Sequence, residues 1–149
     1  MLTGLKIVAT PIGNLKDISL RAIDEIKKAD FVICENPKHS LKLLNNLGIK
    51  KKLISLHDYN EEIIIKKIKY ELKSKVCSLI SDAGSPLISD PGYKLVNYCF
   101  QNDIYVTVVP GPSSLTSALQ ISSLPINQFM FHGFFPKSKK AADDFVEDL

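Results

Sequence analysis

Residues 81–92 carry the densest group of chemically useful residues in the sequence, in the order Ser-Asp-Ala-Gly-Ser-Pro-Leu-Ile-Ser-Asp-Pro-Gly. They directly follow the apolar run of residues 76–80, so we expect a loop that leaves a buried strand. Its glycines accept unusual backbone conformations, its prolines stiffen the path, and Asp82 and Asp90 offer carboxylate acceptors. Such a loop is suited to contact a ligand. The same pattern also occurs in rigid connectors whose aspartates cap helices.

A second group, Pro-Gly-Pro-Ser-Ser at residues 110–114, follows the β-branched run of residues 105–109. We expect it to open a helix, whose free amides would suit a carboxylate or a phosphate. Alone, this group is more typical of a turn and a helix cap than of a site. A small-molecule cleft is the better interpretation if this group and residues 81–92 lie at the same rim, by which we mean the edge of the sheet at the carboxyl ends of its strands.

The elements that would position these loops alternate between short β-branched runs and segments of helical period. We expect strands at residues 5–9, 31–34, 52–56, 76–80 and 105–109. We expect helices at residues 19–29, 40–47, 61–72 and 92–101, and another after residue 113. This order predicts an α/β fold, with a five-stranded parallel sheet and helices on both faces. In such sheets, ligands lie beyond the carboxyl ends of the strands, where both loops would be.

Some details of the helices can also be predicted. Asp17 or Ser19 is expected to cap the first helix, and Gly48 to end the second. In residues 92–101, the apolar side chains expected to face inward are Leu95, Val96, Cys99 and Phe100. In the last helix they are Leu115, Ala118 and Leu119, with Ile121 as a further candidate.

Composition narrows the class of protein only modestly. The 149 residues suit one domain, or one domain with part of another, and 45% are hydrophobic and 23% charged. The net charge of +3 permits a phosphate-bearing partner without arguing for one. Cys34, Cys77 and Cys99 lie in apolar surroundings, which favours buried, reduced thiols in a cytoplasmic protein. No signal peptide and no membrane span is expected.

Several common sites do not fit the sequence. No Gly-x-Gly-x-x-Gly follows the first strand, and no Gly-Lys-Ser or Gly-Lys-Thr occurs. No serine stands in a Gly-x-Ser-x-Gly turn, so serine catalysis is not supported. His39, His57 and His132 are better interpreted as surface or hydrogen-bonding residues than as catalysts. No metal site is expected, because no histidine and carboxylate have convincing ligand spacing.

Three segments together resemble the signature blocks of the tetrapyrrole methylase superfamily: residues 9–19, 81–92 and 110–114. They are most similar to the branch that methylates the ribose 2′-hydroxyl of a cytidine in 16S ribosomal RNA. Residues 133–137 resemble the block that opens the second domain of that branch. The resemblance implies an N-terminal methylase domain at residues 1–123. Residues 124–149 would be a linker and the truncated beginning of a second domain.

The resemblance implies an S-adenosylmethionine-dependent methyltransferase whose cofactor lies in a cleft between two α/β domains. The residues that match the cofactor-binding blocks are Pro11, Asp82, Ala83, Gly84, Ser85, Ser113 and Ser114. Transfer to a ribose hydroxyl requires a proton acceptor. Glu35, His57 and Asp58 are candidates by position, and none is assigned. The implied partners are 16S ribosomal RNA or the small ribosomal subunit, and a second copy of the chain in a homodimer, without metal or membrane.

Two departures from the branch leave other hypotheses open. Where the branch has Glu-Asp-Thr-Arg after the second strand, residues 35–38 read Glu-Asn-Pro-Lys. The forked guanidinium of arginine is thus replaced by the ammonium group of lysine, which acts as a point charge. The chain also stops soon after the second domain would begin, so weakened cofactor binding is expected. A non-catalytic folded remnant is one alternative, and an unrelated nucleotide-binding module is another. A tetrapyrrole or precorrin methylase is a third, although that branch opens with a glycine-rich first loop, unlike residues 10–13.

Overall fold

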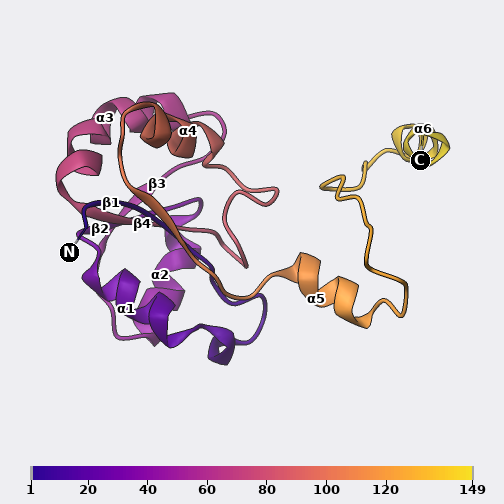
Figure 1. The fold of residues 1–149 in the computed structure, drawn as a ribbon, viewed down its shortest axis with the longest axis horizontal. Coiled ribbons are helices and arrows are strands. Elements are labelled where there is room, and N and C mark those ends of the chain that lie inside the picture. Colours follow the sequence, from indigo (N-terminus) through magenta and orange to yellow (C-terminus); the bar gives the residue numbers. More distant parts are fainter. Residues whose placement is uncertain (1, 149) are drawn as a thin grey trace.

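The computed structural model describes residues 2–148, and its elements alternate as the sequence predicts (Figure 1). In chain order they are β1 (Gly4–Val8), the 3-10 helix η1 (Leu15–Asp17), α1 (Leu20–Lys28), β2 (Phe31–Cys34), α2 (Pro37–Asn46), β3 (Lys52–Ser55), α3 (Glu61–Ser74), β4 (Val76–Ile80), α4 (Tyr93–Gln101), β5 (Val106–Val109), α5 (Ser114–Ile121) and α6 (Lys139–Glu147). Each strand lies within one residue of its expected bounds.

The five strands form one parallel sheet in the order β3-β2-β4-β1-β5. β1 lies between β4 and β5, and Gly4 pairs with Val76 while Leu5 pairs with Val106. All residues of β1, β2 and β4 are buried, as expected for parallel strands covered on both faces. The predicted fold class is therefore confirmed.

Helices cover the two faces of the sheet in pairs (Figure 1). α1 and α2 lie on one face, where Ile26 and Leu44 pack with Val8. α3 and α4 lie on the other face, where Leu72 and Leu95 pack with residues of β1, β2 and β4. Neighbouring side chains of a strand point to opposite faces, so each central strand contributes to both cores.

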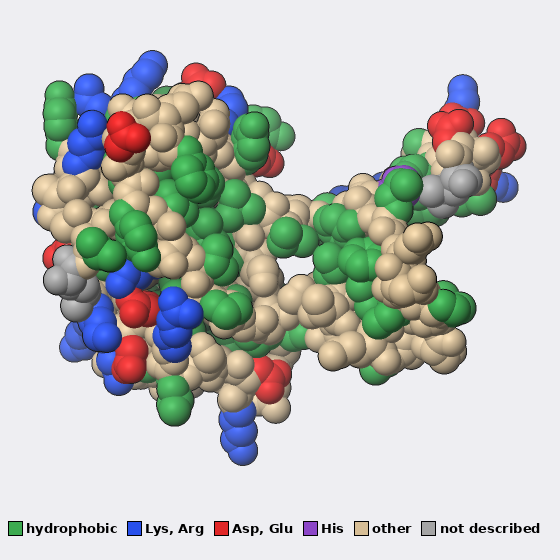
Figure 2. Space-filling view, in the orientation of Figure 1, with side chains coloured by type: hydrophobic (Ala, Val, Ile, Leu, Met, Phe, Trp, Pro, Cys, Tyr) green, Lys and Arg blue, Asp and Glu red, His purple; other side chains and the backbone are tan. Residues whose placement is uncertain are grey.

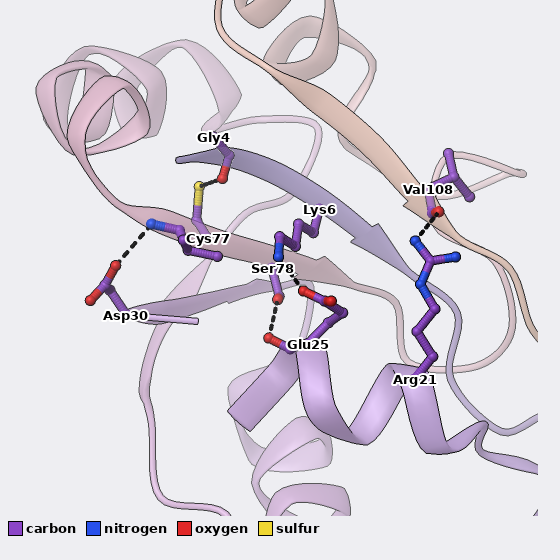
Figure 3. Close-up of polar contacts among 9 residues, drawn as sticks. Gly4, Lys6, Arg21, Glu25, Asp30, Cys77, Ser78 and Val108 are labelled. Carbon is purple, nitrogen blue, oxygen red and sulfur yellow. Dashed lines mark hydrogen bonds and ion pairs between the residues drawn. The ribbon is translucent and has the colours of Figure 1, made fainter. Parts of the chain in front are cut away.

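Polar contacts fix α1 against the sheet (Figure 3). Lys6 is 7% exposed within β1, and its ammonium group pairs with the carboxylate of Glu25 in α1. That hydrogen bond lowers the pKa of Glu25. Ser78 of β4 donates a hydrogen bond to the Glu25 carbonyl at 3.4 Å, and Asp30 accepts one from the Val76 amide at 2.8 Å. The charge buried in β1 is thus neutralised by its neighbouring helix.

The helix ends show one confirmed cap and one correction. Ser19 caps α1 by accepting a hydrogen bond from the Ala22 amide at 3.0 Å. α2 begins at Pro37 rather than at residue 40, because Asn36 accepts hydrogen bonds from the two amides that follow Pro37. Proline suits the first helical position, since its missing N–H would have no partner there. Residues 37–39, expected to precede this helix, therefore form its first turn.

The last part of the chain differs more from expectation. Phe100 is 67% exposed and does not face the core, which contains Leu95 and Cys99. α5 covers no face of the sheet: none of its residues is buried, and Ala118 is exposed. Residues 114–148, which we call the C-terminal arm, leave the body of the protein and end in α6 (Figure 1). Among the helices of residues 2–148, none combines the length and apolar character needed to span a lipid bilayer.

Candidate ligand-binding site

The middle of the sheet creates a crevice at the carboxyl ends of β1 and β4. These strands are neighbours, yet β1 leads to α1 on one face and β4 leads to α4 on the opposite face. The loops that leave these two strands therefore turn toward opposite faces of the sheet. In open α/β sheets, ligands bind in the crevice between two such loops. The two loops there are residues 9–19 and 81–92.

Hydrogen bonds join three of the rim loops to one another. Thr10 and Gly84 form an antiparallel bridge with N–H to carbonyl distances of 2.8 and 3.1 Å. The Thr10 hydroxyl donates to the Ser81 carbonyl at 3.1 Å, and the Ser85 hydroxyl donates to the Pro112 carbonyl at 3.4 Å. The loops after β1, β4 and β5 are thus held together at their closest approach.

Gly84 has a conformation that the bridge requires. Its φ of +83° lies in the left-handed region, and a Cβ there would be 3.2 Å from Cγ2 of Ile12. Gly111 on the third loop is also confined, since its Cβ would lie 3.0 Å from that of Ala9. These glycines explain how the loop backbones approach so closely.

Three adjoining hollows surround the joined loops, and we name each by its outer wall. The α2 hollow, of about 510 Å³, is lined by Pro11, Asp82 and Ala83 with residues of α2. The β5 hollow, of about 450 Å³, is lined by Ser85 and Ser113 with Leu87, Ile88 and Pro110. The arm hollow, of about 560 Å³, is lined by Asp82, Ala83, Asp90 and Ser114 with Phe131 and Phe134.

The structure brings the residues of the sequence-based site together around these hollows. Asp82 and Ala83 stand between the α2 and arm hollows, whereas Ser85 faces the β5 hollow. Gly84 lines none of them and instead forms the bridge to Thr10. Ser113 and Ser114 belong to different hollows because they stand on either side of the α5 N-terminus.

The rim carries two carboxylates of interest, those of Asp82 and Asp90. Oδ1 of Asp82 is buried and has no hydrogen-bond partner within residues 2–148. Burial raises the pKa of Asp90 to about 6, and the negative charges of Glu35 and Asp82 contribute to that rise. The site therefore offers an unsatisfied acceptor and a carboxylate that titrates near neutrality. Both features favour a ligand that carries positive charge or hydrogen-bond donors.

The loop from β4 to α4 also stores backbone strain. Leu87 and Ser89 have φ values of +71° and +62°, which are unfavourable for residues with a side chain. The end of the loop is anchored by Glu61 of α3, whose buried carboxylate accepts hydrogen bonds from the amides of Gly92 at 2.8 Å and Leu95 at 3.2 Å. Strain of this kind persists where the surrounding structure determines the conformation, often at functional sites.

The proposed proton acceptors do not share one location. Glu35, His57 and Asp58 line none of the three hollows. Glu35 alone acts on a residue that does, because its negative charge contributes to the raised pKa of Asp90. Sequence reasoning identified Asp90 as an acceptor without assigning it to the site. Its position in the same loop as Asp82 is the feature of the sequence that indicates a place in the site. Within residues 2–148, no group of three or more His, Cys, Asp or Glu side chains is arranged to hold a metal ion.

A parallel sheet whose rim loops enclose adjoining hollows defines an α/β ligand-binding protein. Residues 4–148 match the family of tetrapyrrole (corrin/porphyrin) methylases, and the chain belongs to this family. The family resemblance carried by the three loop motifs is therefore confirmed.

Two curated relatives share a more specific name. The ribosomal RNA small subunit methyltransferase I of Thermotoga maritima is 46% identical over 136 residues, which are 91% of this chain and 61% of that protein. The protein of the same name from Rickettsia prowazekii is 50% identical over 151 residues, covering 99% of this chain and 53% of that protein. The chain thus spans little more than half of the length of these relatives.

Solved structures share the fold at lower identity. A diphthine synthase has a TM-score of 0.65 at 18% identity, covering 85% of this chain and 51% of that chain. A uroporphyrin-III-C-methyltransferase from Thermus thermophilus has a TM-score of 0.59 at 22% identity, covering 85% of this chain and 54% of that chain. At such identities the likeness concerns the fold alone.

Proposed function

We propose that this chain is the cofactor-binding portion of an S-adenosylmethionine-dependent methyltransferase that acts on the ribose 2′-hydroxyl of a cytidine in 16S ribosomal RNA. The observation that carries the proposal is the identity of 46% and 50% to proteins named ribosomal RNA small subunit methyltransferase I. The joined loops of the rim provide a matching location for chemistry. Such a substrate would be met in the cytoplasm, with the small ribosomal subunit as partner.

The residues of the rim fit S-adenosylmethionine. Its amino group donates hydrogen bonds and its sulfonium is cationic, and the buried, unpartnered oxygen of Asp82 is an acceptor for such groups. Its adenine needs an apolar wall, which Leu87, Ile88 and Pro110 offer in the β5 hollow. We assign cofactor binding to Pro11, Asp82, Ala83, Gly84, Ser85, Ser113 and Ser114. When bound, the cofactor supplies an activated methyl group.

Asp90 is our candidate for the proton acceptor. The ribose hydroxyl must lose its proton as its oxygen gains a methyl group, and a base near the working pH does this best. With a pKa raised to about 6 by burial and by Glu35, Asp90 is ionised at neutral pH and is more basic than an ordinary aspartate. It also lines the arm hollow beside Asp82 and Ser114.

The arm supports two further proposals about assembly. We propose that residues 1–123 are the N-terminal methylase domain and that residues 124–149 begin a second domain. Ile121 is 85% exposed and Phe134 is 84% exposed, and such apolar surface usually becomes covered in an assembly. We therefore also propose a homodimer. Sedimentation equilibrium tests it, and a monomeric mass at every concentration would reject it.

Calorimetric titration with S-adenosylmethionine tests the proposed site. We expect the parent chain to bind and Asp82→Ala to bind about tenfold or more weakly, since a charged hydrogen bond contributes about 1.5–3 kcal/mol. Asp58→Ala is the control, because this exposed aspartate lines none of the three hollows. Equal affinities for the three chains would reject the site. A folded parent that binds nothing would favour the non-catalytic remnant, and binding would lead to a methyl-transfer assay on unmethylated small-subunit RNA.

A further inference from the structure

The end of the sheet opposite the rim carries a concentration of lysines. The segments that lead into β2, β3 and β4 contain Lys27, Lys28, Lys50, Lys51, Lys52, Lys73 and Lys75. Since β3, β2 and β4 are neighbours in the sheet, these segments lie side by side, and we call this surface the basic edge. Figure 2 shows blue side chains, with some red ones among them, on the side of the body away from the C-terminal arm.

The lysines of the basic edge outnumber the carboxylates beside them, although the Lys51 ammonium group donates a hydrogen bond to the Ala29 carbonyl and the charge of Lys28 acts on Glu25. Within residues 2–148, the ion pairs closer than 4.0 Å are Lys6 with Glu25 and Lys94 with Glu62, and neither pair involves this edge. Asp30 lies among the lysines, but one of its carboxylate oxygens already accepts a hydrogen bond from a backbone amide. Several unpaired ammonium groups on one surface attract a polyanion.

A hollow of about 300 Å³ opens in the basic edge. Lys52, Lys67 and Lys75 line it together with the half-buried side chains of Ile54 and Ile64. The three lysines are exposed, and they come from β3, from α3 and from the residue that caps α3. The hollow therefore combines an apolar wall with ammonium groups from three positions.

Two carboxylates, those of Asp30 and Glu71, also line this hollow. Ammonium groups alone would suit any anion, whereas apolar walls with acceptors beside them suit a nucleobase, which has an apolar face and amino donors. A strand of RNA presents bases and phosphates together.

We propose that the basic edge binds the sugar-phosphate backbone of RNA, with an unpaired base in the hollow and with Lys52, Lys67 and Lys75 contacting the phosphates that flank this base. This inference rests on the proposed function, because it concerns the RNA that the rim would methylate. Strands of four or five residues separate the edge from the rim, which is about 15 Å at about 3.3 Å per residue. One RNA that reaches both would have to follow the side of the protein over several nucleotides.

The salt dependence of RNA binding tests the basic edge. The edge variant carries Lys52→Gln, Lys67→Gln and Lys75→Gln, and the control variant carries Lys66→Gln, Lys94→Gln and Lys139→Gln, which remove the same charge elsewhere. The probe is a fluorescent single-stranded RNA of about 20 nucleotides, titrated at several salt concentrations. Each lost phosphate contact lowers the slope of log affinity against log salt by about 0.7. We expect a fall of about 2 for the edge variant and little change for the control.

Equal slopes for the edge and control variants would overturn the proposal, as would a parent chain that shows no salt-dependent RNA binding. An edge variant that keeps its RNA affinity but loses binding to vesicles of anionic phospholipid would also overturn it, in favour of a membrane surface. Calorimetric binding of S-adenosylmethionine is measured on the same chains. If the chains bind S-adenosylmethionine but the salt slopes of RNA binding are equal for the edge and control variants, the basic edge alone is rejected. If the parent chain does not bind S-adenosylmethionine, the proposed function is rejected.

Discussion

Removing the charge of Asp90 is expected to stabilise the protein in a pH-dependent way. The carboxyl has an ordinary pKa of 3.8 and a folded pKa of about 6, because burial and the charge of Glu35 disfavour its ionised form. Each pKa unit corresponds to about 1.36 kcal/mol, so ionisation costs the folded state up to about 3 kcal/mol. Because water still reaches part of the side chain, we expect Asp90→Asn to gain about 1–3 kcal/mol at about pH 8.

The pH dependence of this stabilisation follows from the raised pKa of Asp90. A raised folded pKa means that the penalty is absent below the ordinary pKa, grows as the pH rises between about 4 and 6, and is complete above about 7. Asp90→Asn should therefore match the parent near pH 4 and exceed it at pH 8.

Urea unfolding at both pH values measures this difference. Asp58→Asn is the control, since Asp58 is exposed. A stability difference that is the same at both pH values would show that Asp90 does not titrate as described, and it would also remove the basis for Asp90 as the proton acceptor.

Two further predictions concern how the rim loops are held. Gly84→Ala should cost about 1–2 kcal/mol and weaken S-adenosylmethionine binding, because its φ is +83° and its Cβ would crowd Ile12. Gly13→Ala, with nothing within 4 Å of its Cβ, should leave urea unfolding unchanged. If the two alanine variants behave alike, the bridge is not a constraint on the site. Glu61→Ala should cost about 2–4 kcal/mol in urea unfolding and speed hydrogen exchange at the amides of Gly92 and Leu95. Glu62→Ala, which breaks an exposed ion pair, should leave both measurements nearly unchanged. Unchanged exchange at those amides would contradict an anchoring role for Glu61.

The strands and the position of the rim could be predicted because their signals are local. Residues 76–80 form an uninterrupted apolar run, and a parallel strand buried on both faces requires such a run. The predicted start of α2 at residue 40 is wrong, because the helix begins at Pro37. Asn36 and Pro37 form a recognisable helix cap and first turn, but both residue types are also common in loops.

The errors at Phe100 and Ala118 have a different origin. Periodicity marks which face of a helix is apolar, but not whether another element covers that face. The strained φ of Leu87 and the raised pKa of Asp90 were also beyond prediction, because both depend on neighbours from other segments. The cofactor residues of the sequence-based site meet at the rim, and their assignment to S-adenosylmethionine stays a prediction.

The place of β1 in the sheet has a consequence for the order of folding. Its partners are β4, more than 70 residues away at Val76, and β5, about 100 residues away at Val106. Contacts so distant in sequence form slowly, because a long loop must close before any bond is gained. During synthesis, the first strand must wait for the fifth before its second edge is paired, and the loop after β5 emerges later still. A nascent chain is thus without a complete ligand-binding rim until every strand of the sheet has been made, which links binding competence to completed folding.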